Sequence, residues 1–100
     1  MIPEIIKEKY RRGRHFKTRY QGKVRHYGTV EDYILIPHNG GQGKYLKGVE
    51  KLRYEDGHVE YRFMYWANMG KGWKWGQFCV ILPRELLQEL FNEMVKRGWI

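Results

Sequence analysis

The sequence predicts an α+β fold, a curved antiparallel β-sheet with a short helix before it and an amphipathic helix packed on one of its faces. Two observations predict the sheet: segments of alternating polarity, and hairpin turn signals at Gln21-Gly22 and Asp56-Gly57. A third predicts the last helix, because apolar residues recur at spacings of three and four between Leu86 and Val95. One hundred residues suffice for one domain with a modest core.

The first element is a short basic helix. Pro3 suits its first turn, and Gly13 can end it. Ile6 and Tyr10 share a face, and so short a helix must dock on something or fray. We therefore divide the chain into a basic N-terminal helix or arm, residues 1–14, and a domain of sheet plus C-terminal helix, residues 15–100.

Three strands are expected next. Residues 15–20 and 23–27 alternate around Gln21-Gly22, which would place Lys17 with Arg19 on one face. By the same alternation, the second segment would group Lys23, Arg25 and Tyr27. Residues 30–36 include an apolar run typical of a buried strand, which we expect to end at Pro37. Residues 38–44 are then expected to form a loop.

The second half of the sheet surrounds the strongest turn signal in the chain. Strands at residues 45–54 and 58–66 flank Asp56-Gly57, and a turn at residues 68–72 leads to a final strand at residues 73–82. The last helix begins at Pro83 and finishes at Gly98. We expect it to cover one row of side chains from each of the last two strands: Tyr61, Phe63, Tyr65, Phe78, Val80 and Leu82. A second row would point away from it: Arg62, Met64 and Trp66.

The composition favours some functional classes and excludes others. The formal net charge is +8, and residues 1–27 alone hold nine basic and two acidic side chains, which favours a polyanionic partner. The chain lacks serine, which excludes a serine triad. Cys79 is the only cysteine, so no internal disulfide can form, and the four histidines show no metal-ligand spacing. We expect no metal or cofactor, no membrane span, and a soluble cytoplasmic protein.

Large rings stand among basic residues between Tyr61 and Phe78, which is the best functional clue. Neighbouring residues of a strand point to opposite faces, so some of these rings should face outward. Outward rings beside cations suit unpaired nucleic acid, whose bases stack and whose phosphates carry charge. The candidate nucleic-acid-binding residues are Arg12, Arg14, Lys17, Arg19, Lys23, Arg25, Tyr27, Arg62, Trp66, Lys71, Trp73, Lys74 and Trp75.

Each clue also has a simpler interpretation. The rings could have a purely structural role on the sheet or lie in a dimer interface, and the basic run at residues 7–14 could be a solvated helix face. The glycines of residues 40–43 lack the spacing of a phosphate-binding loop, and a hairpin connection is the better interpretation. The primary interpretation of the C-terminal helix is that it forms part of the core. The secondary interpretation is a homodimer interface, because little chain remains to cover its apolar stripe.

The order of elements resembles the single-stranded-DNA-binding fold of positive cofactor four and the Whirly proteins, and also the archaeal ThermoDBP type. The resemblance covers residues 15–98 and is most specific over residues 72–78 and 82–86. It is one of architecture, and this chain differs by its basic N-terminal helix and its larger number of strands. It implies helix-paired dimers that present basic, aromatic strands to an unpaired strand. The residues in those positions here would be Lys17, Arg19, Arg25, Arg62, Trp66 and Lys74.

The sequence thus predicts a protein that binds single-stranded DNA or RNA with little sequence preference and has no catalytic residues. Two other classes stay open. Small basic α+β proteins include toxin ribonucleases, for which His58, Arg62 and Tyr65 could serve. The other class is a protein-interaction module whose rings lie in a partner interface.

Overall fold

The computed structural model describes residues 2–20, 22–40 and 43–100, and at residues 18–20, 24–25, 39–40 and 43 it describes the backbone alone. Five strands form one sheet in the order β1-β2-β3-β4-β5, and every neighbouring pair is antiparallel. The predicted α+β class is confirmed. The elements are α1 (Glu4–Arg11), β1 (His15–Tyr20), β2 (Lys23–Gly40), β3 (Gly43–Tyr54), β4 (Val59–Asn68), β5 (Trp73–Gly76) and α2 (Arg84–Lys96).

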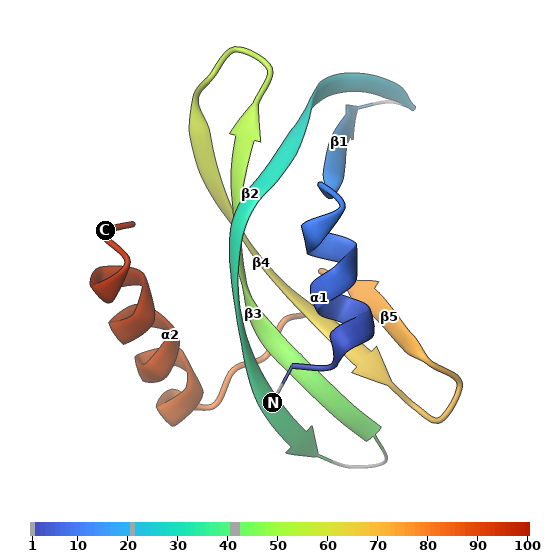
Figure 1. Cartoon of the computed structure of the whole chain (residues 1–100), viewed down its shortest axis with the longest axis vertical. Coiled ribbons are helices and arrows are strands. Elements are labelled where there is room, and N and C mark those ends of the chain that lie inside the picture. Colours follow the sequence, from blue (N-terminus) through green and yellow to red (C-terminus); the bar gives the residue numbers. More distant parts are fainter. Residues whose placement is uncertain (1, 21, 41–42) are drawn as a thin grey trace.

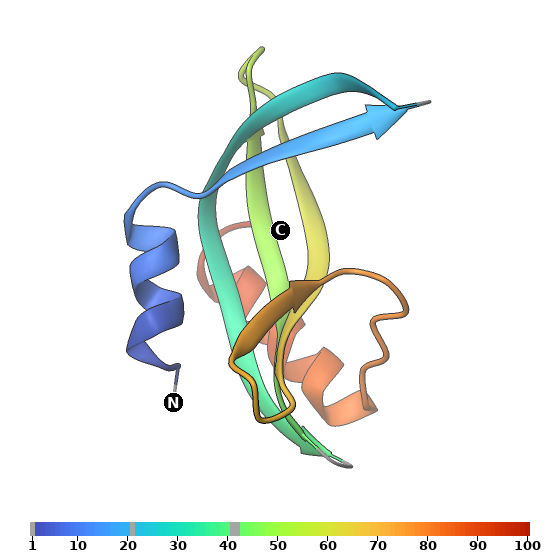
Figure 2. The ribbon, with the colours of Figure 1, turned by 90° about the vertical axis from the view of Figure 1, so that its right-hand side faces the viewer.

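The two helices lie on opposite sides of the central strands. In Figure 1, α1, β1 and β5 are on one side of β2, β3 and β4, and α2 is on the other. Figure 2 shows how the β1–β2 hairpin and β5 project away from the central strands, so that the sheet is strongly curved. Each side has its own core, one that contains Ile6 and Tyr10 of α1 and one that contains Leu86, Leu90 and Met94 of α2.

Both helices have the predicted bounds. Pro3 and Pro83 precede their first turns, and Gly13 and Gly98 follow their ends with φ of 81° and 74°. These positive φ values suit glycine, which has no Cβ to clash with the preceding carbonyl. Ile6 and Tyr10 are buried, so of the two alternatives for α1, docking and fraying, the structure shows docking. Neither helix in the described ranges is long and apolar enough to span a membrane.

β2 is longer than predicted. It continues through Pro37 to Gly40, so the expected end at Pro37 and the expected loop from residue 38 are wrong for the described part of that segment. At Pro37, β3 is the only sheet neighbour of β2, and an edge position can accept a residue without an N–H. A β-bulge after Val30 also shifts the alternation, so that Val30 and Leu35 both join the α1 side of the core.

β5 is shorter than predicted. It ends at Gly76, and residues 77–83 cross to α2 without strand structure. Gly76 is closely covered, since a Cβ there would lie 2.4 Å from Cζ of Tyr65. Cys79 has a φ of 51°, which extended backbone cannot adopt. Phe78, expected under α2, is therefore 80% exposed.

α2 lies on the predicted face of the sheet but covers less of it. Its buried row packs with Ile34 of β2 and Val49 of β3. On β4, Tyr61 stacks on Trp99 just beyond the helix, with ring centroids 5.6 Å apart, and donates a hydrogen bond to its carbonyl oxygen. Phe63 is left exposed, so the prediction that α2 covers the β4 row is wrong for that residue.

The close approach of β2 and β3 generates a stability prediction. A Cβ at Gly48 would lie 1.7 Å from the carbonyl oxygen of Ile34, and backbone cannot give way as a flexible side chain can. We expect Gly48→Ala to lower the free energy of unfolding by about 3 kcal/mol, measured by urea denaturation. Gly57→Ala is the control, because nothing lies near that site. Only the strain of its positive φ should lower the free energy of unfolding, by about 1 kcal/mol. Equal losses would contradict this account of the packing.

Candidate nucleic-acid interface

The side of the sheet that faces α1 holds Arg14, Arg62, Trp66, Trp73 and Trp75 of the predicted residues, but Trp66 is not open to a ligand. Trp66 is 2% exposed, and its Nε1 donates to the hydroxyl of Tyr10 at 3.0 Å. Tyr10 in turn stacks on Tyr33, with ring centroids 3.8 Å apart. Trp66 does point away from α2 as predicted, but α1 docks on that face. The expectation that Trp66 looks outward is therefore wrong.

A buried carboxylate organises this face. Glu50 of β3 is 0% exposed and lies directly opposite Arg62 of β4 and Tyr33 of β2. It accepts hydrogen bonds from the hydroxyl of Tyr10 at 2.7 Å and from Nε and Nη2 of Arg62 at 3.0 and 2.7 Å. Nε of Arg14 lies 3.5 Å from Oε2 of Glu50, the oxygen that also accepts the hydrogen bond from Tyr10. Two guanidinium groups thus share one carboxylate, which leaves one positive charge in excess.

The hydroxyl of Tyr10 is held in its donating form. Burial raises the pKa of Tyr10, and the negative charge of Glu50 and the hydrogen bond to it raise this pKa further. The neutral hydroxyl therefore persists over the whole range in which the protein would be studied. It ties α1 to the sheet at a position where a charged phenolate would repel Glu50.

Trp75 lies between the two arginines. It is opposite Trp66 in the β4–β5 register, and its ring centroid is 4.5 Å from Cζ of Arg62 and 5.4 Å from Cζ of Arg14. Guanidinium groups at these distances are attracted to the face of an indole. The ring is only half-buried. Trp75 is thus a partly accessible indole with two cations at its ring. Its Nε1 is enclosed and has no hydrogen-bond partner among the described residues.

A groove opens beside this cluster. Its volume is about 550 Å³, and its lining includes Lys17 from β1, Tyr54 from β3, Arg62 from β4 and Gln77 after β5. Glu60 adds a carboxylate to the lining. The groove therefore joins segments that are far apart in the sequence, from Lys17 to Gln77, and its polar groups can both attract phosphate and donate hydrogen bonds.

The other predicted residues lie around this groove or outside it. Lys23 and Tyr27 are exposed on the β1–β2 hairpin, Lys71 and Lys74 are exposed at β5, and Trp73 is half-buried. Arg12 is exposed and paired with Glu8 on the outer surface of α1. The side chains of Arg19 and Arg25 are outside the described part of the structure.

The predicted common face of Lys23, Arg25 and Tyr27 does not follow from the register. Tyr27 pairs with Lys17, but a shift after Thr18 makes Lys23 pair with Tyr20, which breaks the alternation. The bulge therefore separates Lys23 from Tyr27. Sequence patterning gives no signal for a bulge of this kind.

Sequence reasoning missed Glu50, Tyr10 and Lys9. The last has its Nζ 5.8 Å from the ring centroid of Trp66. The turn signal alone could not identify Glu50, because counting outward from a two-residue Asp56-Gly57 turn would pair it with Phe63, whereas the actual register pairs it with Arg62. No signal existed for Tyr10 either, because the docking of α1 depends on tertiary packing.

Charge is divided unequally along the chain. Residues 84–100, which contain α2, hold three basic and three acidic side chains, so their charges cancel. The whole +8 therefore comes from residues 1–83, with sixteen basic and eight acidic side chains. Each of those eight carboxylates lies within 4 Å of an arginine, lysine or histidine nitrogen. Among the described residues, several lysines have no carboxylate within this distance.

A titratable cluster occupies the β3–β4 hairpin. His58 contacts Asp56 through Nδ1 and Glu60 through Nε2, and its ring stacks on Tyr54 with centroids 4.2 Å apart. Hydrogen bonds to Asp56 and Glu60 raise the pKa of His58, and the backbone N–H and ring of His58 lower the pKa of Asp56. Because both ring nitrogens are engaged, His58 is poorly placed to act as a general base. Arg62 and Tyr65 point to opposite faces of β4, so the residues considered for a ribonuclease are not assembled.

Comparisons with known proteins do not identify a family for this chain. No protein-family model, curated protein or solved structure matches the chain. Across the described ranges, no group of three or more His, Cys, Asp or Glu side chains could hold a metal ion. The resemblance to the positive cofactor four and Whirly fold stays a prediction.

The role of Glu50 generates a second stability prediction. Glu50→Gln would leave two guanidinium groups at the α1 interface without a buried countercharge, so we expect a loss of about 3 kcal/mol in urea denaturation. The matched control is Glu31→Gln. Glu31 also has two cationic partners, Lys51 and Arg53, but its pairs lie near the surface and should be worth less than about 1 kcal/mol. Similar losses of unfolding free energy in both variants would show that the buried Glu50 contributes no more to stability than the Glu31 pairs near the surface.

The His58 cluster generates a pH prediction. In an NMR titration, the pKa of His58 should lie above its ordinary value of 6.5 and should return toward that value in Asp56→Asn combined with Glu60→Gln. Because the pKa is raised in the folded state, the stability that these contacts supply is present at low pH and is lost as the pH rises through the raised pKa. Glu85→Gln, which lies on α2, should leave the titration unchanged. An unshifted His58 would contradict the described contacts.

Proposed function

We propose that the protein binds single-stranded nucleic acid with little sequence preference through the side of the sheet that carries α1, β1 and β5. The observation that carries this proposal is the position of Lys9, Lys17, Lys23, Lys71 and Lys74 on α1, the β1–β2 hairpin and the segment at β5, within residues 1–83, which hold the whole +8. A surface of this kind favours a polyanion and accelerates its encounter.

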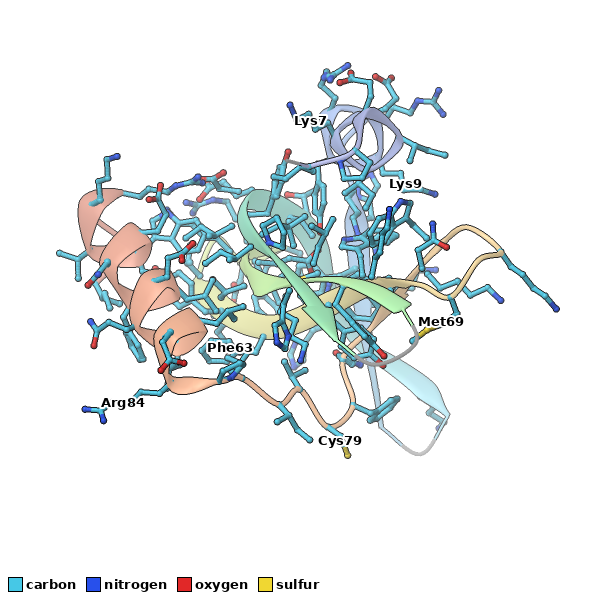
Figure 3. The ribbon with its side chains drawn as sticks, turned by 90° about the horizontal axis from the view of Figure 1, so that it is seen from below. Lys7, Lys9, Phe63, Met69, Cys79 and Arg84 are labelled. Atoms are coloured by element: carbon cyan, nitrogen blue, oxygen red, sulfur yellow. The ribbon has the colours of Figure 1, made fainter. Side chains whose placement is uncertain are left out.

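The lysines supply the free charge. In the described part of the chain, no carboxylate lies within 4 Å of the ammonium group of Lys9, Lys17, Lys23, Lys71 or Lys74. Lys9 and Lys7 project from α1, as Figure 3 shows. Carboxylates on this side are already neutralised by other partners, so these lysines can contact phosphates without first breaking an ion pair.

The rings favour a single strand over a duplex. Tyr27 is 59% exposed and pairs across strands with Lys17, and Trp73 and Trp75 are half-buried near Lys71 and Lys74 in sequence. Stacking on such rings requires bases that are not already paired, and it is worth about 1–3 kcal/mol per base. The supporting geometry is a groove of about 550 Å³ rather than a projecting helix of the kind that enters a major groove.

Replacing lysines on the charged side tests this proposal. Lys17→Gln, Lys71→Gln and Lys74→Gln combined should weaken binding of a labelled single-stranded oligonucleotide and reduce the slope of log K against log salt by about 2, since each phosphate contact on a single strand contributes about 0.7. Fluorescence anisotropy over a salt series measures both. The matched control, Arg84→Gln with Lys96→Gln, removes charge from α2 and should leave the slope unchanged.

Three results would contradict the proposal. One is wild-type binding that does not weaken with salt, and another is an equal loss in the α2 control. The third is progressive cleavage of a labelled RNA strand, which would favour the ribonuclease class. A duplex of the same sequence should bind more weakly than the single strand.

A further inference from the structure

We propose that the outer edge of β4 binds an extended peptide segment of a partner protein, which adds to the sheet as a further strand. This β4 edge consists of the backbone groups of Val59, Tyr61 and Phe63 on the side away from β3. The proposal differs from nucleic-acid binding in the class of partner and in the groups that make the contact. It does not rest on the proposed function.

One half of β4 has a single sheet neighbour. β4 pairs with β3 along its whole length, from Val59 to Asn68. β5 pairs with it only from Tyr65 onward, and the chain leaves the sheet after Gly76. In Figure 1, β5 accordingly lies beside the lower part of β4. Among the described residues, no strand pairs with the outer side of residues 59–64.

The register identifies which backbone groups are unpaired. In antiparallel strands, the N–H and C=O of one residue point to the same side, and successive residues alternate between the two sides. The N–H of Tyr54 donates to the carbonyl oxygen of His58, so His58 faces β3. The register has no shift from there on, so Val59, Tyr61 and Phe63 face away from β3. The β4 edge thus offers a donor and an acceptor at every second residue.

This edge lacks the protection that the other long edge of the sheet has. Natural sheets commonly block free edges with proline, lysine or a bulge. On the outer edge of β2, Pro37 has no N–H, and the N–H and C=O of Tyr33 are occupied by Asp32 and Arg97, each at 2.8 Å. Residues 59–64 of β4 contain no proline, glycine or lysine and no register shift. The β4 edge is therefore the better template for an added strand.

A hollow opens along the same edge. The groove of about 550 Å³ is lined by three successive residues of β4, Glu60, Tyr61 and Arg62. Successive residues of a strand point to opposite faces, so a hollow that all three line must open around the edge of the strand. Gln77, the first residue after β5, also lines it. Space for an added strand therefore begins where β5 ends.

The alternation of donors and acceptors selects a polypeptide as the occupant. An extended polypeptide carries N–H and C=O groups at the same two-residue repeat, so it can satisfy every group of the β4 edge. The backbone of a DNA strand offers acceptors alone, and it would leave the carbonyl oxygens of Tyr61 and Phe63 without donors.

The side chains beside the edge specify the composition of the peptide. On the face toward α2, Tyr61 and Phe63 are 39% and 41% exposed, which suits apolar neighbours across the strands. On the other face, Arg62 lines the groove together with Lys17, and no described carboxylate lies within 4 Å of the Lys17 ammonium group. An acidic side chain there would pair with Lys17, and the net charge of +8 attracts such a peptide. The partner is thus a segment in which apolar and acidic residues alternate.

Hydrogen exchange of the full chain, followed by NMR, tests the proposal. In the free protein, the amides of Tyr61 and Phe63 should exchange much faster than those of Arg62 and Met64, which face β3. The probe is a seven-residue peptide of alternating valine and glutamate. At on the order of 1 mM, it should slow exchange at Tyr61 and Phe63 by about tenfold and leave Arg62 unchanged. Slow exchange of all four amides in the free protein would overturn the proposal, as would a peptide that protects none of them.

Methylated peptides test whether the backbone makes the contact. N-methylation of every valine or of every glutamate places the methyl groups on opposite edges of the extended peptide, and only one edge can face β4. In fluorescence anisotropy, one methylated form should therefore bind about tenfold more weakly than the unmethylated peptide, and the other should bind like it. Equal binding of the two methylated forms would contradict strand addition.

A matched pair of protein variants tests the edge from the other side. Phe63→Pro removes an N–H that faces away from β3, and an edge strand tolerates proline at such a position. Phe63→Ala removes the same ring and keeps the N–H. Phe63→Pro should bind the peptide more weakly than Phe63→Ala, with circular dichroism to establish that both are folded. Equal affinities of two folded variants would count against the proposal, and the methylated peptides decide it if Phe63→Pro does not fold.

The exchange experiment also distinguishes other occupants of the edge. Protection of Tyr61 and Phe63 that rises with protein concentration in the absence of peptide would assign the edge to a second copy of the chain. Protection by an oligonucleotide and not by the peptide would assign it to nucleic acid. Either result would refute a peptide site. Because the peptide experiments contain no oligonucleotide, their failure is distinguishable from failure of the proposed nucleic-acid binding.

Discussion

The arrangement depends on one buried carboxylate. Glu50 holds the hydroxyl of Tyr10 and the guanidinium groups of Arg14 and Arg62, so it joins α1 and the segment after it to the middle of the sheet. A buried carboxylate is tolerable only when it is well paired, and here the hydrogen bonds come from α1 and β4 and a further ion pair comes from Arg14 after α1. The same contacts place two cations on the face of Trp75. Structure and the proposed binding surface therefore share a single electrostatic centre.

The two sides of the sheet have separate chemistry. The α1 side combines surplus lysines with half-buried rings, whereas the α2 side combines a neutral helix with exposed apolar residues.

Much of the fold follows from local signals in the sequence. Pro3, Gly13, Asp56-Gly57 and Gly98 mark helix ends and a turn through backbone preferences that tertiary contacts did not overrule. Non-local features were not predictable in the same way. The bulges in β2, the left-handed backbone at Cys79 and the docking of α1 over Trp66 depend on packing between segments far apart in sequence. Arg14 and Arg62 were predicted as site residues and Glu50 was not, and the docking of α1 decided which indole stays accessible.

NMR titration of the labelled protein with a single-stranded oligonucleotide tests the central claim most directly. If the α1 side binds the strand, the amides of the β1–β2 hairpin and β5 and the indole N–H signals of Trp73 and Trp75 should shift. The signals of α2 and the indole N–H of Trp99 should stay in place. Shifts concentrated in α2, or no shifts at low salt, would contradict the account.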